Sequence, residues 1–127
     1  MIGFTFDKAE ANQAMSYRTI AQQFGDCIVQ GDYGAAYALL AKELRSTATP
    51  QTIKDAVATT TSYASAPILK AEVMDDSILE SWPDKQPGDL AVVYVALNGD
   101  SFSEAVTLTL ATYGDEVLIR HLEWGRP

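Results

Sequence analysis

The fold is decided by the stretch GDYGAAYALLAKEL, residues 31–44, which combines a helix end, a helix start and an apolar helix face. Gly31 suits the left-handed conformation in which many helices end, and Asp32 can accept hydrogen bonds from the first amides of a following helix. The apolar side chains that follow recur at the spacing of one helix face: Tyr33, Ala36, Tyr37, Leu40 and Leu44. The stretch therefore predicts two helices that meet at this junction.

The helix before this junction should be long. Asp7 and Glu10 have the spacing of a capping box, and Phe6 stands where a hydrophobic staple begins. A helix to about Gln30 is predicted, with an apolar stripe of Ala14, Tyr17, Ile20, Ala21, Phe24, Cys27 and Ile28. Cys27 is expected to be a small buried residue rather than a nucleophile, because no His or Lys lies near it in sequence.

A third helix should begin at Thr49-Pro50, which supplies an N-cap residue and a proline at the first helical position. Its inner face is predicted to be Ile53, Ala56, Val57, Thr60 and Ala64. The helix should end at Ala66-Pro67, since a residue before proline is biased away from the helical conformation.

From Ile68 onward the pattern predicts four strands, at residues 68–76, 90–98, 102–112 and 116–124. Asn98-Gly99 is a strong hairpin signal, and the strand before it is apolar on both faces, as in a central strand. Val117, Ile119, His121 and Glu123 should share one face of the last strand. Three helices and about four antiparallel strands predict a single α+β domain, with the helices on the concave face of a curved sheet.

The composition excludes several classes of function. The 127 residues contain one cysteine and one histidine, so neither an intramolecular disulfide nor a closed Cys/His zinc site is expected. A formal charge of -8 disfavours nucleic acid, because such binding depends on neutralising phosphates. No apolar run approaches the length of a membrane span, and the start lacks a signal peptide, which predicts a cytoplasmic protein if Met1 is the native start. No cofactor or metal is predicted.

The order of these elements resembles the superfamily of nuclear transport factor two and ketosteroid isomerase, a cone-shaped, cystatin-like α+β fold. The resemblance rests on the long first helix, on GDYGAAYALL at 31–40, on Thr49-Pro50 and on the closing residues 121–125. Members of this superfamily serve as isomerases, dehydratases, ligand carriers, transport adaptors and toxin-immunity proteins. The resemblance therefore implies a fold rather than one function.

The resemblance implies a pocket between the helices and the concave face of the sheet. The residues expected near it are Tyr17, Phe24, Tyr37, Tyr63, Tyr94 and His121. Core packing is the alternative for each of them, and for the aromatic residues on a helical stripe it is favoured. The convex face is the second implied surface. Because one layer of helices covers only one face of an apolar sheet, a homodimer packed through the convex face is predicted, with long side chains and the loop 81–89 as the alternative cover.

His121 is the only histidine, the residue type that titrates near neutrality. On the concave face it could act as a general base oriented by Asp26 or Tyr17. On the convex face, which is favoured, it would be an interface or surface residue.

These observations predict a non-catalytic domain that binds a small hydrophobic ligand in an apolar pocket, or that binds a protein. The acidic charge fits a basic partner, as for an immunity or regulatory protein. The alternative is a small isomerase or dehydratase with Tyr17 and His121 as its catalytic groups. The superfamily's isomerases need a carboxylate base, and no aspartate of this sequence matches it by local motif.

Overall fold

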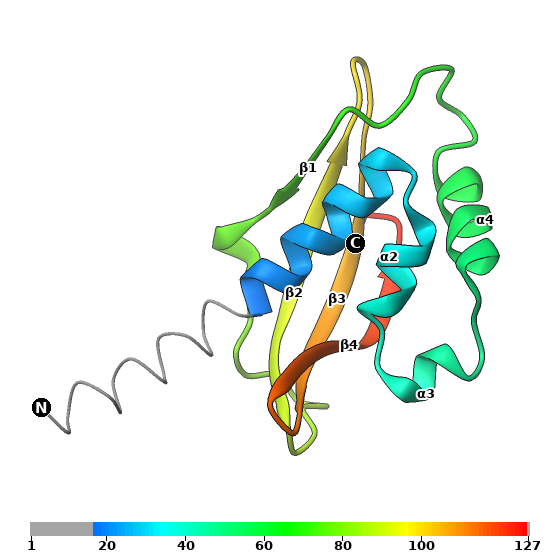
Figure 1. The fold of residues 1–127 in the computed structure, drawn as a ribbon. Coiled ribbons are helices and arrows are strands. Elements are labelled where there is room, and N and C mark those ends of the chain that lie inside the picture. Colours follow the sequence, from blue (N-terminus) through cyan, green and yellow to red (C-terminus); the bar gives the residue numbers. More distant parts are fainter. Residues whose placement is uncertain (1–16, 127) are drawn as a thin grey trace, which may run out of the picture.

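In the computed structural model, residues 17–126 are described, and helices lie against one face of a four-stranded antiparallel sheet (Figure 1). The strands β1 (Lys70–Val73), β2 (Asp89–Asn98), β3 (Ser103–Tyr113) and β4 (Glu116–Trp124) are neighbours in that order. The helices are the 17–30 helix, α2 (Tyr33–Ala38), α3 (Lys42–Arg45) and α4 (Pro50–Thr60), and a short 3-10 helix, η1 (Asp75–Ser77), follows β1. The α+β class is confirmed, but the described residues form four α-helices instead of three.

The predicted junction at Gly31 is confirmed. Gly31 has a φ of +73°, in the left-handed region, and the 17–30 helix ends there. The Asp32 carboxylate accepts a hydrogen bond from the Ala35 N–H at 3.1 Å and so caps α2. The predicted capping box at Asp7 and Glu10, with Phe6 and Ala14, lies outside the described residues.

The single helix predicted to follow Asp32 is divided into α2 and α3, because the chain between them pairs with β4. The Ile119 N–H donates to the Leu39 carbonyl at 2.9 Å, and the Ala41 N–H donates to the Ile119 carbonyl at 2.7 Å. Ile119 has no exposed surface, so its backbone groups would otherwise be buried without a partner. This requirement overrides the helical pattern of the sequence.

Helix α4 begins as predicted and ends earlier. Thr49 and Thr52 form a reciprocal capping box, with Pro50 at the first helical position. The helix ends at Thr60 instead of continuing to Ala66-Pro67. The Thr61 hydroxyl donates to the Val57 carbonyl at 2.8 Å, and a run of β-branched residues here lowers helix propensity.

The sheet has a helix face, on which the helices pack, and an outer face. Side chains alternate between the two faces along β2, and Val93 and Val95 have no exposed surface. The 17–30 helix lies very close to this face, since a Cβ added at Gly25 would be 2.6 Å from the Ala71 Cβ and 3.0 Å from the Val95 Cγ1. Val95 is therefore a core residue beneath a helix.

A β-bulge in β4 reverses part of the predicted alternation. Thr109 pairs with His121 and Leu110 with Ile119, so Arg120 is the extra residue. The grouping of His121 with Ile119 on one strand face was therefore wrong. Val117 and Ile119 lie on the helix face, Leu122 and Trp124 rejoin it after the bulge, and His121 and Glu123 lie on the outer face.

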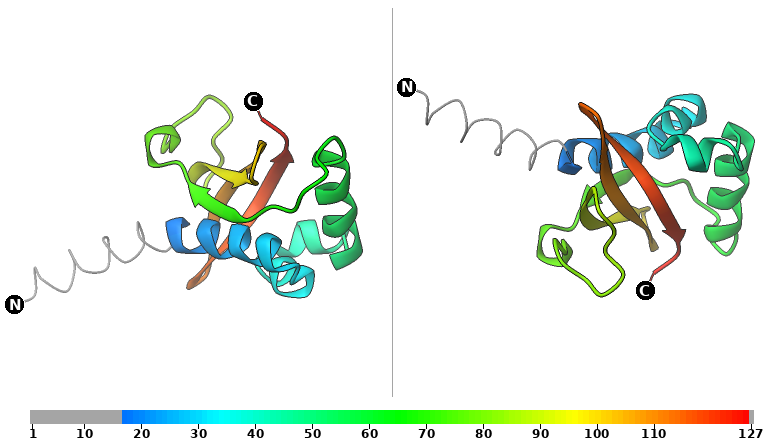
Figure 2. Two further views of the ribbon diagram at one scale, coloured as in Figure 1. Left: turned by 90° about the horizontal axis from the view of Figure 1, so that it is seen from above. Right: turned by 90° about the horizontal axis from the view of Figure 1, so that it is seen from below.

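The outer face carries polar side chains, including those of Thr107, Thr109, His121 and Glu123. The later part of the segment between β1 and β2 lies on this side of the sheet (Figure 2), whereas Asp75 and Glu80, earlier in the segment, contact Arg18 and Tyr17 of the 17–30 helix. The premise of the homodimer prediction, a largely apolar second face, is thus weaker than the sequence suggested, and the homodimer stays a prediction. Within residues 17–126, no helix is both long and apolar enough to cross a membrane.

Candidate functional site

The structure does not bring the six predicted pocket residues together. Tyr17 and Phe24 lie in the core on the helix side, with 7% and 0% of their surface exposed. Tyr37 donates a hydrogen bond to the Arg45 carbonyl, and Tyr63, which is exposed, donates to Glu104. The remaining two, Tyr94 and His121, lie on the outer face of the sheet.

Tyr17 and His121, the alternative catalytic pair, lie on opposite faces of the sheet. The Tyr17 hydroxyl donates to Glu80 at 3.1 Å, and burial followed by this hydrogen bond raises the pKa of Tyr17 above its ordinary value. The His121 Nε2 lies 3.2 Å from a Glu123 carboxylate oxygen. Asp26, proposed as an orienter of His121, is exposed on the 17–30 helix and accepts from Gln22. Tyr17, His121 and Asp26 therefore do not form one acid–base site.

One surface groove lies on the helix side and has a volume of about 370 Å³. It is formed by the last residues of the 17–30 helix, by one side of α4 and by residues 66–68, and we call it the helix-end groove. Its lining comprises Ile28, Val29, Gln30, Gly31, Tyr33, Lys54, Val57, Ala58, Thr61, Ala66, Pro67 and Ile68. Most of these side chains are apolar. Lys54 is the one charged residue among them, and no described residue forms an ion pair with it.

A second groove lies on the outer face and also measures about 370 Å³. The loop after η1 forms one wall, β2 and β3 form the floor, and β4 forms the other wall. We call it the outer-face groove, and its lining residues are Trp82, Asp84, Gln86, Val92, Thr107, Thr109, Arg120, His121 and Glu123. Of the predicted site residues, only His121 lines either groove.

Hydrogen bonds hold the loop wall both to β2 and within itself. The Leu79 and Val92 backbones exchange two bonds, of 2.8 and 3.0 Å, at the start of the loop. The Lys85 ammonium donates to the Glu80 carbonyl at 2.7 Å and lies 5.7 Å from the centre of the Trp82 ring, within reach of a cation–π contact. The wall is therefore tied to the edge of β2 and braced internally.

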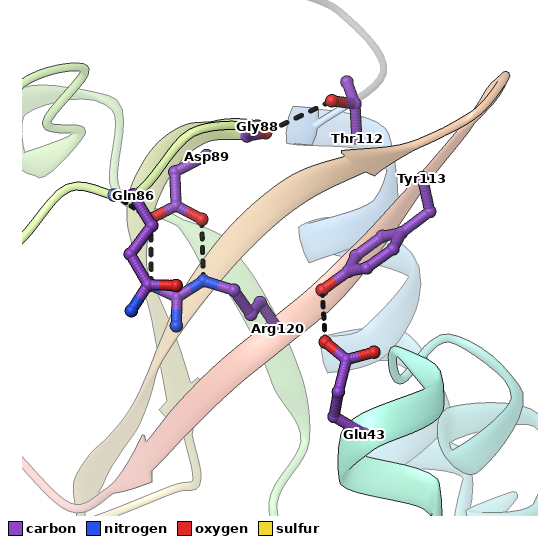
Figure 3. A network of polar contacts seen from close by, with 7 residues as sticks. All are labelled: Glu43, Gln86, Gly88, Asp89, Thr112, Tyr113 and Arg120. Atoms are coloured by element: carbon purple, nitrogen blue, oxygen red, sulfur yellow. Dashed lines mark hydrogen bonds and ion pairs between the residues drawn. The ribbon is translucent and has the colours of Figure 1, made fainter.

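A buried ion pair fixes the end of this loop to β4 (Figure 3). Arg120 donates two hydrogen bonds to Asp89, at 2.6 and 2.9 Å, and the Gln86 N–H donates a third at 2.9 Å. The Asp89 side chain is completely buried, whereas that of Arg120 is 23% exposed. Burial alone would raise the pKa of Asp89, but the bonds from Arg120 and Gln86 outweigh it and hold that pKa below its usual value.

Two bulges bring this pair together across β3. Besides Arg120 in β4, β2 has an extra residue at Leu90, because Asp89 pairs with Ala111 and Ala91 pairs with Leu110. Each bulge sits beside or at one member of the ion pair, consistent with the use of bulges to re-aim a side chain. The sequence pattern cannot reveal either bulge, so this ion pair was not predicted.

The same end of the sheet is tied to the helices by Tyr113. Its hydroxyl donates to the Glu43 carboxylate on α3 at 2.9 Å (Figure 3). Burial and then this hydrogen bond raise the pKa of Tyr113 to about 12. Gly88, on the loop, accepts two bonds from Thr112, which precedes Tyr113. Hydrogen bonds and an ion pair thus connect the loop, β3, β4 and α3 around the outer-face groove.

The floor of the outer-face groove contains hydroxyl groups without protein partners. Thr109 has only 7% of its surface exposed, and neither it nor Thr107 forms a side-chain hydrogen bond with any residue of 17–126. Because no buried side-chain oxygen of the described residues is without a partner, these two hydroxyls are accessible from the groove and can donate to or accept from a bound group. Threonines alternating along a strand are the only sequence signal that pointed to them.

No group of three His, Cys, Asp or Glu side chains within the described part of the chain is arranged to hold a metal ion. Compared with known proteins, the chain matches no family model, no curated protein and no solved structure.

Proposed function

We propose that this chain is a non-catalytic binding domain that takes up a small, largely apolar ligand in the helix-end groove. The observation that carries the proposal is the lining of that groove, in which apolar side chains surround one cation, Lys54. Its volume of about 370 Å³ falls in the range of ligand sites, which are mostly apolar with a few polar groups that fix orientation.

The lining also supports a class of ligand. Lys54 has no ion-pair partner among the described residues, although the chain carries a net charge of -8. A ligand with an apolar body and one anionic group would bury the body against Val57 and Ile68 and place its charge beside Lys54. We therefore propose an amphiphilic carboxylate, or a ligand of similar chemistry.

The enzymatic alternative draws less support from this groove. Its described lining contains neither a carboxylate nor a histidine, the usual general bases of isomerases and dehydratases. As a further part of the proposal, the order of helices and strands favours membership of the nuclear transport factor two-like superfamily, with its cone shape. That superfamily includes ligand carriers, which agrees with a binding role.

The test is a titration of isotopically labelled protein with decanoate, followed by backbone amide shifts. We expect shifts centred on residues 28–33, 54–61 and 66–68. Decanol, with the same apolar body and no charge, should bind more weakly by about 1.4- to 5-fold, the range of an exposed ion pair. Lys54→Gln should lower decanoate affinity to that of decanol.

Lys42→Gln is the matched control, because it removes one exposed cation from α3 outside the groove. It should leave decanoate binding unchanged. Ala58→Trp should block both ligands by filling the groove. Binding that survives Ala58→Trp, or amide shifts confined to other parts of the protein, would contradict the proposed site.

A further inference from the structure

We propose that the outer-face groove is a second binding site, which receives the guanidinium or ammonium group of a basic side chain on a protein partner. This site is separate from the helix-end groove, so it does not depend on the function proposed above. It is built from the 80–88 loop, the floor of β2 and β3, and β4.

The first support is the Thr109 hydroxyl. Thr109 is nine-tenths buried, it lines the groove, and no described residue donates to it or accepts from it. No buried side-chain nitrogen or oxygen among the described residues lacks a partner, so this hydroxyl is open to the groove and is not sealed in the core. Thr107, two residues away on the same strand face, adds a second unpaired hydroxyl. Together they offer hydrogen bonds to a polar group that enters the groove.

The second support is the charge of the lining. Asp84 and Glu123 contribute one carboxylate from each wall. Arg120 does not neutralise them, because its two hydrogen bonds go to the buried carboxylate of Asp89. His121, beside Glu123, carries a positive charge only when protonated. The groove therefore has acceptors and negative charge for a cation, and Trp82 adds an aromatic ring of the type that attracts cations.

The third support is the rigidity of the walls. The Asp89–Arg120 pair joins the end of the loop to β4, and the Gln86 N–H binds the same carboxylate. A preformed groove spares a ligand the cost of ordering the loop. Its volume of about 370 Å³ suits one long side chain rather than a folded element. The net charge of -8 would steer a basic partner toward the protein, which favours a protein source for the cation.

The experiment is a titration of the full chain with the tripeptide acetyl-Gly-Arg-Gly-amide, monitored by the Trp82 indole N–H and by backbone amides. A second tripeptide carries citrulline in place of arginine, which keeps the shape and removes the charge. We expect shifts in Trp82, Thr109 and Glu123 with the arginine peptide, and binding at least about tenfold weaker with citrulline.

Variants separate the groove from the general acidity of the protein. Glu123→Gln should weaken binding of the arginine peptide by about 1.4- to 5-fold, the range of an exposed ion pair, since the Glu123 side chain is 72% exposed. Glu116→Gln, at the other end of β4 and outside the lining, should not change it. Thr109→Val should also weaken binding. Its thermal midpoint should stay close to that of the wild type, because the hydroxyl it removes has no protein partner.

Four results would overturn the proposal. The first is equal binding of the arginine and citrulline peptides, and the second is equal loss of binding in the Glu123 and Glu116 variants, which would indicate only a diffuse acidic surface. The third is free guanidinium binding as tightly as the arginine peptide, which would make the groove a small-cation site instead of a docking site. The fourth is a dimer in the native mass spectrum that Glu123→Lys disrupts. That result would assign the outer face to self-association instead of to a separate partner.

Discussion

Arg120→Met tests whether the buried ion pair holds the outer side of the sheet together. Methionine keeps much of the apolar stem of arginine and removes the two hydrogen bonds to Asp89. The carboxylate, whose side chain is completely buried, would keep only the Gln86 N–H as a partner. The variant therefore leaves a buried negative charge without its cationic partner, which destabilises a fold more than removing both charges does.

The expected loss follows from this geometry. Breaking a buried ion pair by removing one partner costs about 3–5 kcal/mol. Because the Arg120 side chain is 23% exposed, water can partly reach the site, and the Gln86 bond remains. We therefore expect a loss of about 3 kcal/mol, at the lower end of that range. This is a large fraction of the stability of a domain, about 5–15 kcal/mol in typical cases.

The loss should depend on pH. The pKa of Asp89 is lowered in the folded protein, so its ion pair stabilises the fold above the unfolded pKa, about 3.9, and this contribution disappears as the pH falls through the folded pKa. In Arg120→Met, burial without the cation should raise the pKa of Asp89, so the carboxyl becomes neutral at a higher pH. The difference between the two proteins should shrink as the solution is acidified.

Urea unfolding at neutral pH and at about pH 4 measures both effects. Arg18→Met is the control, since Arg18 and Asp75 form an ion pair whose side chains are 49% and 60% exposed. That pair should contribute no more than about 1 kcal/mol. If Arg120→Met costs no more than Arg18→Met at neutral pH, or if its cost grows in acid, the reasoning is refuted. Adding Asp89→Asn to Arg120→Met should recover part of the loss.

Two further changes probe the packing of the helices on the sheet. Gly25→Ala should destabilise the fold by about 1–3 kcal/mol through overpacking, because the new Cβ would lie 2.6 Å from the Cβ of Ala71. Gly34→Ala is the control, since a Cβ there meets no such contact, and it should be neutral or stabilising. Urea unfolding measures both variants. Tyr113→Phe should remove a phenol that ionises at about pH 12 in an absorbance titration, because burial and the hydrogen bond to Glu43 raise its pKa. The fall in wild-type stability between the unfolded pKa of about 10 and that value should become smaller. A phenol lost near pH 10 instead would contradict the buried, hydrogen-bonded environment of Tyr113.

The sequence allowed much of the local structure to be predicted, because its signals lie within a few residues of one another. The helix end at Gly31, the cap at Asp32 and the start of α4 at Thr49-Pro50 are of this kind. The division between α2 and α3 is not, since it depends on hydrogen bonds to Ile119, far along the chain. Tertiary pairing here overrides the local helix pattern.

The candidate sites were harder to predict than the fold. A single extra residue in β4, Arg120, moves every later side chain to the opposite face, so alternation alone placed His121 with Ile119. The wall residue Trp82 comes from a loop whose prolines and glycine indicate only a turn. The helix-end groove is formed by the end of one helix, one side of α4 and residues 66–68, and no spacing within one helix encodes it.

The pairing of residues 39–41 with Ile119 also affects how the sheet can grow. An edge strand with free backbone groups invites a strand from another molecule, which can lead to aggregation. In this protein the outward N–H and carbonyl of Ile119 are already bonded to Ala41 and Leu39, in the middle of β4. An incoming strand would have to displace the segment that joins α2 to α3 before it could add along β4. The break in the predicted helix thus protects the sheet from extension at this edge.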